Sequence, residues 1–124
     1  MKMDCFAIVL LACSIIGCAA LAPDFRARAD DAFRKQNRLS AEFMLMVASE
    51  KAPASGLYAG LFEYEAAMLD ACQPLNTIAA KRRDNQRVTL HEKRAVLDSL
   101  DPCESAATVF EARLQAFPER SSRP

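Results

Sequence analysis

Five cysteines carry the clearest chemistry in this chain of 124 residues. Cys72 and Cys103 are too far apart to form the Cys-x-x-Cys motif of a redox enzyme. Two thiols and the single histidine, His91, also make a poor ligand set for zinc. In an oxidising compartment, an even pair of this kind forms a structural disulfide. The sequence therefore predicts a disulfide between Cys72 and Cys103 if the protein is exported.

The indication of export lies at the N-terminus. An apolar run begins at Cys5, shortly after Lys2, and closes with Ile15-Ile16-Gly17-Cys18. This tetrapeptide resembles the lipobox of bacterial lipoprotein precursors. The resemblance implies that residues 1–17 are a signal peptide and that cleavage falls before Cys18, which is then acylated and anchors the protein in a membrane. Ala19, a non-acidic residue after that cysteine, favours the outer membrane, with the chain facing the periplasm or the cell surface.

Two other interpretations of the N-terminus stay open. An ordinary secretory signal peptide ends in a small-x-small site. Cys18-Ala19-Ala20 and Ala20-Leu21-Ala22 fit that pattern, although Pro23 follows the second. An uncleaved anchor needs about 20 apolar residues, which is more than the run from Cys5 to Leu21 offers.

The composition of the whole chain limits the functions and folds that it can have. The 16 basic and 16 acidic residues give no net charge, so no overall field favours nucleic acid as a partner. Abundant Ala, Leu, Glu and Arg, with three glycines and no tryptophan, favour helices. No nucleophile elbow or glycine-rich phosphate loop is present, which predicts a protein that is not an enzyme. His91 is expected on the surface.

A small-molecule, haem or metal carrier is the alternative function. Met44, Met46 and Met68 could join His91 as ligands of a haem iron. Methionines at helical spacing more often fill a core, and three helices enclose a haem poorly. We therefore expect no cofactor.

Three series of apolar residues follow the spacing of helices, in steps of three and four. No stretch alternates with the period of a strand. The first series is Phe25, Ala29, Ala32, Phe33, Leu39, Phe43, Met46 and Val47. The second is Tyr58, Leu61, Glu65, Met68, Cys72, Leu75 and Ala79, with one polar member. The third is Val96, Leu100, Cys103, Ala107, Phe110, Leu114 and Phe117.

Turn signals separate these series at residues 52–56 and 83–87, and Thr89 and Glu92 form a capping box after the second turn. Pro118 is expected to end the last helix. The sequence thus predicts an all-α fold, an antiparallel up-down-up three-helix bundle. It occupies residues 24–118, between a tether at 18–23 and a disordered tail at 119–124. Each helix is expected to hold about 27 residues and to span roughly 40 Å.

The cysteines agree with this arrangement. Cys72 and Cys103 are equally distant from a point between residues 87 and 88, beside the second turn, so they should face each other and staple the second hairpin. Pro74 and Pro102 lie next to the cysteines and predict kinks, because proline bends or breaks a helix. The apolar series continue in phase through both prolines, so we expect bent but continuous helices.

Two sets of residues are candidates for intermolecular contact. Cations surround the second turn, at Lys81, Arg82, Arg83, Arg87, Lys93 and Arg94. Helix one leaves the membrane and helix two returns, so this turn should lie near anionic lipid. Neutralising the helix dipole is the alternative role.

Aromatic side chains near the first turn are the second set. Tyr58, Phe62 and Tyr64 could contact a protein, although Phe62 would also suit the core. We therefore expect a non-enzymatic envelope lipoprotein that binds an envelope protein through a helical surface. Such a protein would act as an accessory, exclusion, immunity or inhibitor-type factor.

Overall fold

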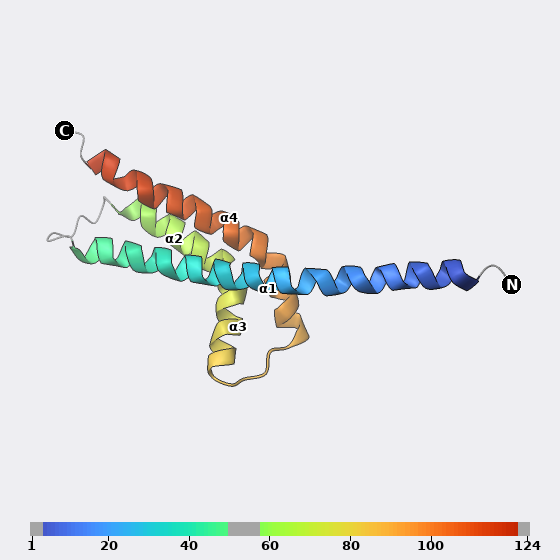
Figure 1. Cartoon of the computed structure of the whole chain (residues 1–124). Helices are drawn as coiled ribbons and strands as arrows, with labels where there is room; N and C mark the ends of the chain where they lie inside the picture. Colours follow the sequence, from blue (N-terminus) through green and yellow to red (C-terminus); the bar gives the residue numbers. More distant parts are fainter. Residues whose placement is uncertain (1–3, 50–57, 122–124) are drawn as a thin grey trace.

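The computed structural model describes the backbone of residues 4–49 and 58–121, and the side chains of residues 24–49 and 58–117. Within these ranges the chain is all helical, with four helices and no strand (Figure 1). They are α1 (Asp4–Ser49), α2 (Ala59–Ala71), α3 (Gln73–Arg83) and α4 (Leu90–Ser121). The predicted all-α class is confirmed. The predicted cleavage point before Cys18 and the tether at 18–23 fall within α1, and their side chains lie outside the described residues.

The predicted apolar series supply most of the core, but in the second series Ala79 is only half-buried, and Ile78, which belongs to no series, is buried instead. Phe43 of α1 is fully buried and meets the ring of Phe110 of α4 edge to face, with ring centres 5.7 Å apart. Aromatic pairs of this geometry add to the stability that burial provides. The third series lies entirely in the core, except for Phe117, which packs half-buried against it. The buried apolar residues are Ala32, Leu39, Phe43, Tyr58, Leu61, Met68, Cys72, Leu75, Ile78, Val96, Leu100, Cys103, Ala107, Phe110 and Leu114.

The second predicted helix is divided in two, so the expectation of a bent but continuous helix there was wrong. α2 ends at Ala71, Cys72 connects the helices with φ −90° and ψ 0°, and α3 begins at Gln73. Pro74 explains the break, because its ring would clash with the carbonyl group four residues earlier in a regular helix. In the first turn of α3 the missing N–H of Pro74 needs no partner. α3 therefore leaves the line of α2 (Figure 1).

α4 remains one helix through Pro102, as predicted. Figure 1 shows a change of direction between its first turns, which lie beside α3, and its longer part, which lies beside α1 and α2. A proline inside a helix is a common cause of such a bend. The helix also continues past Pro118 to Ser121, so its predicted end was wrong, and the predicted tail at 119–124 begins inside α4.

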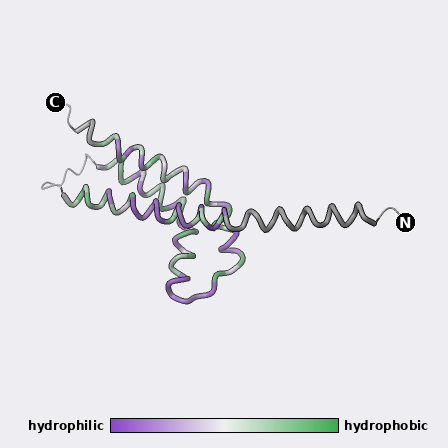
Figure 2. The backbone as a smooth tube through the Cα atoms, viewed as in Figure 1, coloured by the Kyte–Doolittle hydropathy of each residue, from purple (hydrophilic) through white to green (hydrophobic). Residues whose placement is uncertain are grey.

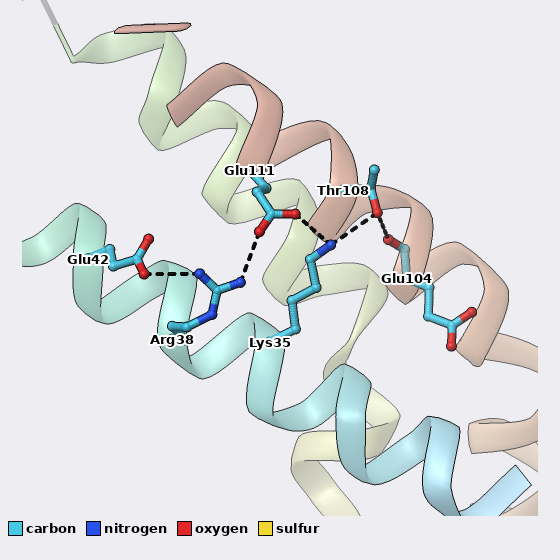
Figure 3. A network of polar contacts seen from close by, with 6 residues as sticks. All are labelled: Lys35, Arg38, Glu42, Glu104, Thr108 and Glu111. Carbon is cyan, nitrogen blue, oxygen red and sulfur yellow. Dashed lines mark hydrogen bonds and ion pairs between the residues drawn. The ribbon is translucent and has the colours of Figure 1, made fainter. Parts of the chain in front are cut away.

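Ion pairs join α1 to α4 along one side (Figure 3). Arg28 lies 2.6 Å from both Asp101 and Glu104, and Arg38 lies 2.9 Å from Glu111. Lys35 lies 2.7 Å from Glu111 and donates a hydrogen bond to Thr108. The pairs 28–101, 35–108 and 38–111 are each separated by 73 residues. A constant difference in residue number between paired positions is expected when two packed helices run in the same direction.

The charges of this network shift the pKa values of its members. Lys35, and then Arg38, donate hydrogen bonds that hold the pKa of Glu111 below its usual range. The carboxylates of Glu104 and Asp101 raise the pKa of Arg28. Most of these side chains are partly exposed, and exposed ion pairs contribute little stability individually. Their main effect is to define the alignment of α1 with α4.

Candidate functional site

Cys72 and Cys103 lie at disulfide distance, with their sulfur atoms 2.02 Å and their Cα atoms 4.7 Å apart. Both side chains are fully buried between α2–α3 and α4. The contact predicted across the second turn is therefore present, even though Cys72 lies at a break between helices. Two further pairs of similar register connect this part of the chain with α4. The ring of Tyr64 in α2 lies 5.0 Å from the guanidinium of Arg113, and the ring of Tyr58, the residue before α2, lies 4.9 Å from that of Phe117.

These contacts correct one predicted interaction residue. Tyr58 is 4% exposed and stacks on Phe117, so it belongs to the core and not to an exposed contact surface. Tyr64 is half-buried under Arg113. Phe62, which was also considered for the core, is instead 46% exposed. Of the three aromatic candidates, Phe62 is the one that offers most surface to a partner.

Phe62 belongs to a surface on α1 and α2 whose exposed residues are mostly apolar, with half-buried Glu65 as a charged residue between Phe62 and Leu69. Its ring centre lies 4.8 Å from that of Phe43, which places it where α2 meets α1. On α1, Gln36 contacts α3 and Phe43 contacts α2. Beside these two buried residues, exposed residues of α1 form a stripe at helical spacing. We call this surface the α1–α2 face; its exposed residues are Asn37, Ala41, Met44 and Ala48 of α1 and Phe62, Ala66 and Leu69 of α2.

The α1–α2 face differs from the opposite side of α1. There, Arg28, Lys35 and Arg38 pair with acids of α4. On the α1–α2 face the large apolar side chains are exposed: Met44 by 56%, Phe62 by 46% and Leu69 by 42%. Depletion of charge, together with aromatic residues and methionine, is typical of the central part of a protein interface.

The predicted basic residues gather on the hairpin formed by α3, residues 84–89 and the first turns of α4. Two of the six are paired with acids: Lys81 contacts Glu92, and Arg83 lies 3.0 Å from Asp84. The other four are exposed and have no ion pair among the described residues: Arg82, Arg87, Lys93 and Arg94. Figure 2 shows hydrophilic residues along the tip of this hairpin. His91 is exposed there, as predicted.

Two capping motifs define the hairpin. The predicted capping box is confirmed: the Thr89 N–H donates to Glu92 Oε2 at 2.8 Å, and the Glu92 N–H donates to Thr89 Oγ1 at 3.2 Å. A second motif was missed. Asn85 has φ 53°, and the N–H groups of Asn85 and Gln86 donate to the carbonyls of Arg82 and Lys81. This Schellman motif ends α3, and an asparagine directly after a helix was the available signal.

Glu92→Gln is expected to remove stability that is present at neutral pH and absent in strong acid. The Lys81 ammonium, and then the Thr89 N–H, lower the pKa of Glu92 to about 2 from 4.5. The ionised form therefore stabilises the fold above pH 4.5, and this stabilisation is lost as the pH falls through 2. Urea unfolding at pH 7 and at pH 2 measures the effect. Wild type should exceed Glu92→Gln in stability at pH 7 only.

The control for that measurement is Glu63→Gln. Glu63 is an exposed carboxylate of α2 without an ion pair among the described residues. Its replacement should change stability little at either pH. Equal losses in both variants at pH 7 would contradict a specific role of the Lys81–Glu92 pair.

One buried polar contact was not predicted. Gln36 of α1 is 1% exposed, and its amide Nε2 donates to Oδ1 of Asn76 in α3, while Asn76 Nδ2 donates back to Gln36 Oε1 at 3.3 Å. Buried amides are costly unless they are paired, so this contact favours one alignment of α3 against α1. Neither residue belongs to an apolar series, and each finds its partner only in the folded chain.

Among the described residues, no three His, Cys, Asp or Glu side chains gather as they would around a metal ion. Within residues 24–49 and 58–117, no helix is long and apolar enough to cross a membrane. Cys18 and the apolar run from Cys5 to Leu21 lie outside the residues whose side chains the structure describes.

Comparison with known proteins identifies no relative: no protein-family model matches the chain, and no curated protein or solved structure is significantly similar to it.

Proposed function

We propose that this protein is a non-enzymatic envelope lipoprotein that is anchored through Cys18 and binds another envelope protein through the α1–α2 face. The observation that carries the binding proposal is the exposure of Met44, Phe62 and Leu69 on one largely apolar surface. The anchor rests on the resemblance of residues 15–18 to a lipobox. Ala19 supports placement in the outer membrane, with the bundle facing the periplasm or the cell surface.

We further propose that the helices form the predicted up-down-up bundle, with its middle member divided into α2 and α3. The constant separation of 73 residues between ion-paired positions of α1 and α4 supports a common direction for these two helices. Cys72–Cys103 and Tyr58–Phe117 are both centred between residues 87 and 88. This shared centre supports the opposite direction of α2 relative to α4.

The α1–α2 face suits binding because it combines exposed apolar groups with small neighbours. Ala41, Ala48 and Ala66 would allow a partner helix to approach closely, and Phe62 and Met44 would provide large contact areas. Residues of these large types dominate the energetics of many interfaces. No observation among the described residues favours the alternative function, a small-molecule, haem or metal carrier.

Leu69→Glu is expected to weaken partner binding by about 30-fold or more, which corresponds to roughly 2 kcal/mol at a central interface residue. A charge at this position would be desolvated in the complex without a counter-ion. The measurement is photo-crosslinking in the native envelope, with a photoreactive amino acid in place of Met44 in the full chain. The crosslinked species should be lost in Leu69→Glu.

Val109→Glu is the matched control. Val109 is 45% exposed, close to the 42% of Leu69, but it lies on α4 outside the α1–α2 face. Its replacement should leave the crosslink intact. Equal losses in both variants would exclude the α1–α2 face as the binding surface. His91→Ala should also retain function; if it alone abolished function in a folded, anchored protein, a ligand-binding or catalytic role would replace the binding proposal.

A further inference from the structure

Two leucines on the hairpin of α3 and α4 are unusually exposed. Leu90 is 80% exposed and Leu97 is 55% exposed. They are seven residues apart on α4, with exposed Arg94 between them at position i+4, so the three side chains follow one face of the helix. We call Leu90, Arg94 and Leu97 the hairpin stripe. Val96 and Leu100 occupy the buried face of the same turns.

The surroundings of the hairpin stripe are cationic. Residues 81–97 contain six Lys or Arg and two acids. Both acids are already paired, Asp84 with Arg83 and Glu92 with Lys81. Arg82, Arg87, Lys93 and Arg94 have no ion pair among the described residues, and the next acid in the chain, exposed Asp98, lies one turn after Arg94. This excess of cations is local, because the whole chain has no net charge.

The hairpin stripe lies on the side of α4 that meets α1. Continuing the stripe by one turn from Leu97 leads to Asp101, which pairs with Arg28 of α1 at 2.6 Å. From Arg28, the chain runs back toward Cys18 over ten residues, which is about 15 Å along a helix. The α3–α4 hairpin is therefore at the end of the bundle that lies nearest to the proposed anchor (Figure 1).

We propose that the α3–α4 hairpin docks on the anionic lipid surface beside the anchor, with Leu90 and Leu97 inserted among the headgroups and the four unpaired cations on the lipid phosphates. Apolar side chains flanked by lysine and arginine are the composition of helices that lie in a membrane interface. Each cation near an anionic surface strengthens association about fivefold. This inference rests on the membrane anchor of the proposed function and is independent of the protein partner.

The absence of tryptophan from the natural chain makes a direct test possible. Leu90→Trp introduces a single fluorescent probe into the hairpin stripe of the full chain. The protein is reconstituted on phosphatidylcholine vesicles with or without phosphatidylglycerol, and bromine on the lipid chains serves as a quencher. Docking predicts a shift of tryptophan emission to shorter wavelength and quenching by brominated lipid, both stronger with phosphatidylglycerol.

Leu45→Trp is the control, because Leu45 is 71% exposed near the opposite end of the bundle. Its emission should resemble that of a solvent-exposed probe on both vesicles. In the Leu90→Trp background, Arg87→Ala with Arg94→Ala should weaken the phosphatidylglycerol-dependent signal about 25-fold. Circular dichroism verifies that each variant retains its helices.

Other outcomes would overturn the proposal. If the chain floats with vesicles but Leu90→Trp stays solvent-exposed, the hairpin does not dock, and the anchor stands. If the emission shifts equally on neutral vesicles, the cations have no role. If it shifts only when envelope proteins are added, the hairpin binds protein and not lipid. If the chain does not float, both docking and anchoring fail.

Discussion

Replacing Cys72 and Cys103 together by alanine is expected to lower the free energy of unfolding by about 2–5 kcal/mol. The two sulfur atoms lie at bonding distance across a separation of 31 residues. Closing a loop of that length restricts the unfolded chain and stabilises the fold by roughly 3–4 kcal/mol in the chain-entropy model. Because small domains have total stabilities of about 5–15 kcal/mol, the double variant should lose much of its resistance to denaturant.

Reduction distinguishes the stability that the disulfide provides from the stability that the packing of the two side chains provides, since both side chains are fully buried. A reducing agent should lower the unfolding midpoint of the natural protein and leave that of the double alanine variant unchanged. Mass analysis of protein isolated from the envelope should show two hydrogens gained on reduction at this pair. Free thiols at both positions in oxidised envelope protein would show that no crosslink forms.

Cys18→Ser is expected to abolish lipid attachment and to leave unprocessed precursor in the membrane. The resemblance of residues 15–18 to a lipobox assigns the acyl chains to the thiol and amino group of this cysteine, and a serine hydroxyl does not replace the thiol. Labelling of cells with a radioactive or clickable palmitate, followed by electrophoresis, measures attachment and processing together. Fractionation of the labelled natural protein should place it in the outer membrane.

Cys13→Ser is the matched control, since it removes a thiol from the same apolar run but outside the lipobox. Its labelling and processing should equal those of the natural chain. Cys18→Ser protein that is cut and released normally would indicate an ordinary secretory signal peptide. A natural chain that keeps its first 17 residues and carries no lipid would indicate an uncleaved anchor.

Much of the core was predictable because helical periodicity depends on local sequence. Val96, Leu100 and Phe110 follow steps of three and four on one helix, and all three are buried. Tyr58 illustrates the strength of this signal: it begins the second apolar series, and its burial agrees with that series, whereas its aromatic character alone had suggested an exposed contact.

The unpredicted features depend on contacts between distant segments or on local geometry. The predicted apolar series continued in phase through Pro74 and gave no sign that α2 and α3 separate there. After Leu75 it named Ala79, whereas the buried residue is Ile78. The Gln36–Asn76 contact joins residues 40 apart. The exposure of Phe62 and Leu90 likewise depends on which helix faces are left uncovered after packing.

The separation of 73 residues between paired positions of α1 and α4 also sets the earliest point in synthesis at which these two helices can pack together. Arg28, Lys35 and Arg38 meet polar partners 73 to 76 residues later in the chain. During synthesis α1 is therefore complete well before the residues that align it exist. Under the proposed export the chain would cross the inner membrane extended, and α1 could not pair with α4 until residues 101–111 had followed it across. Folding would then follow translocation, with the C-terminal third as the last part required.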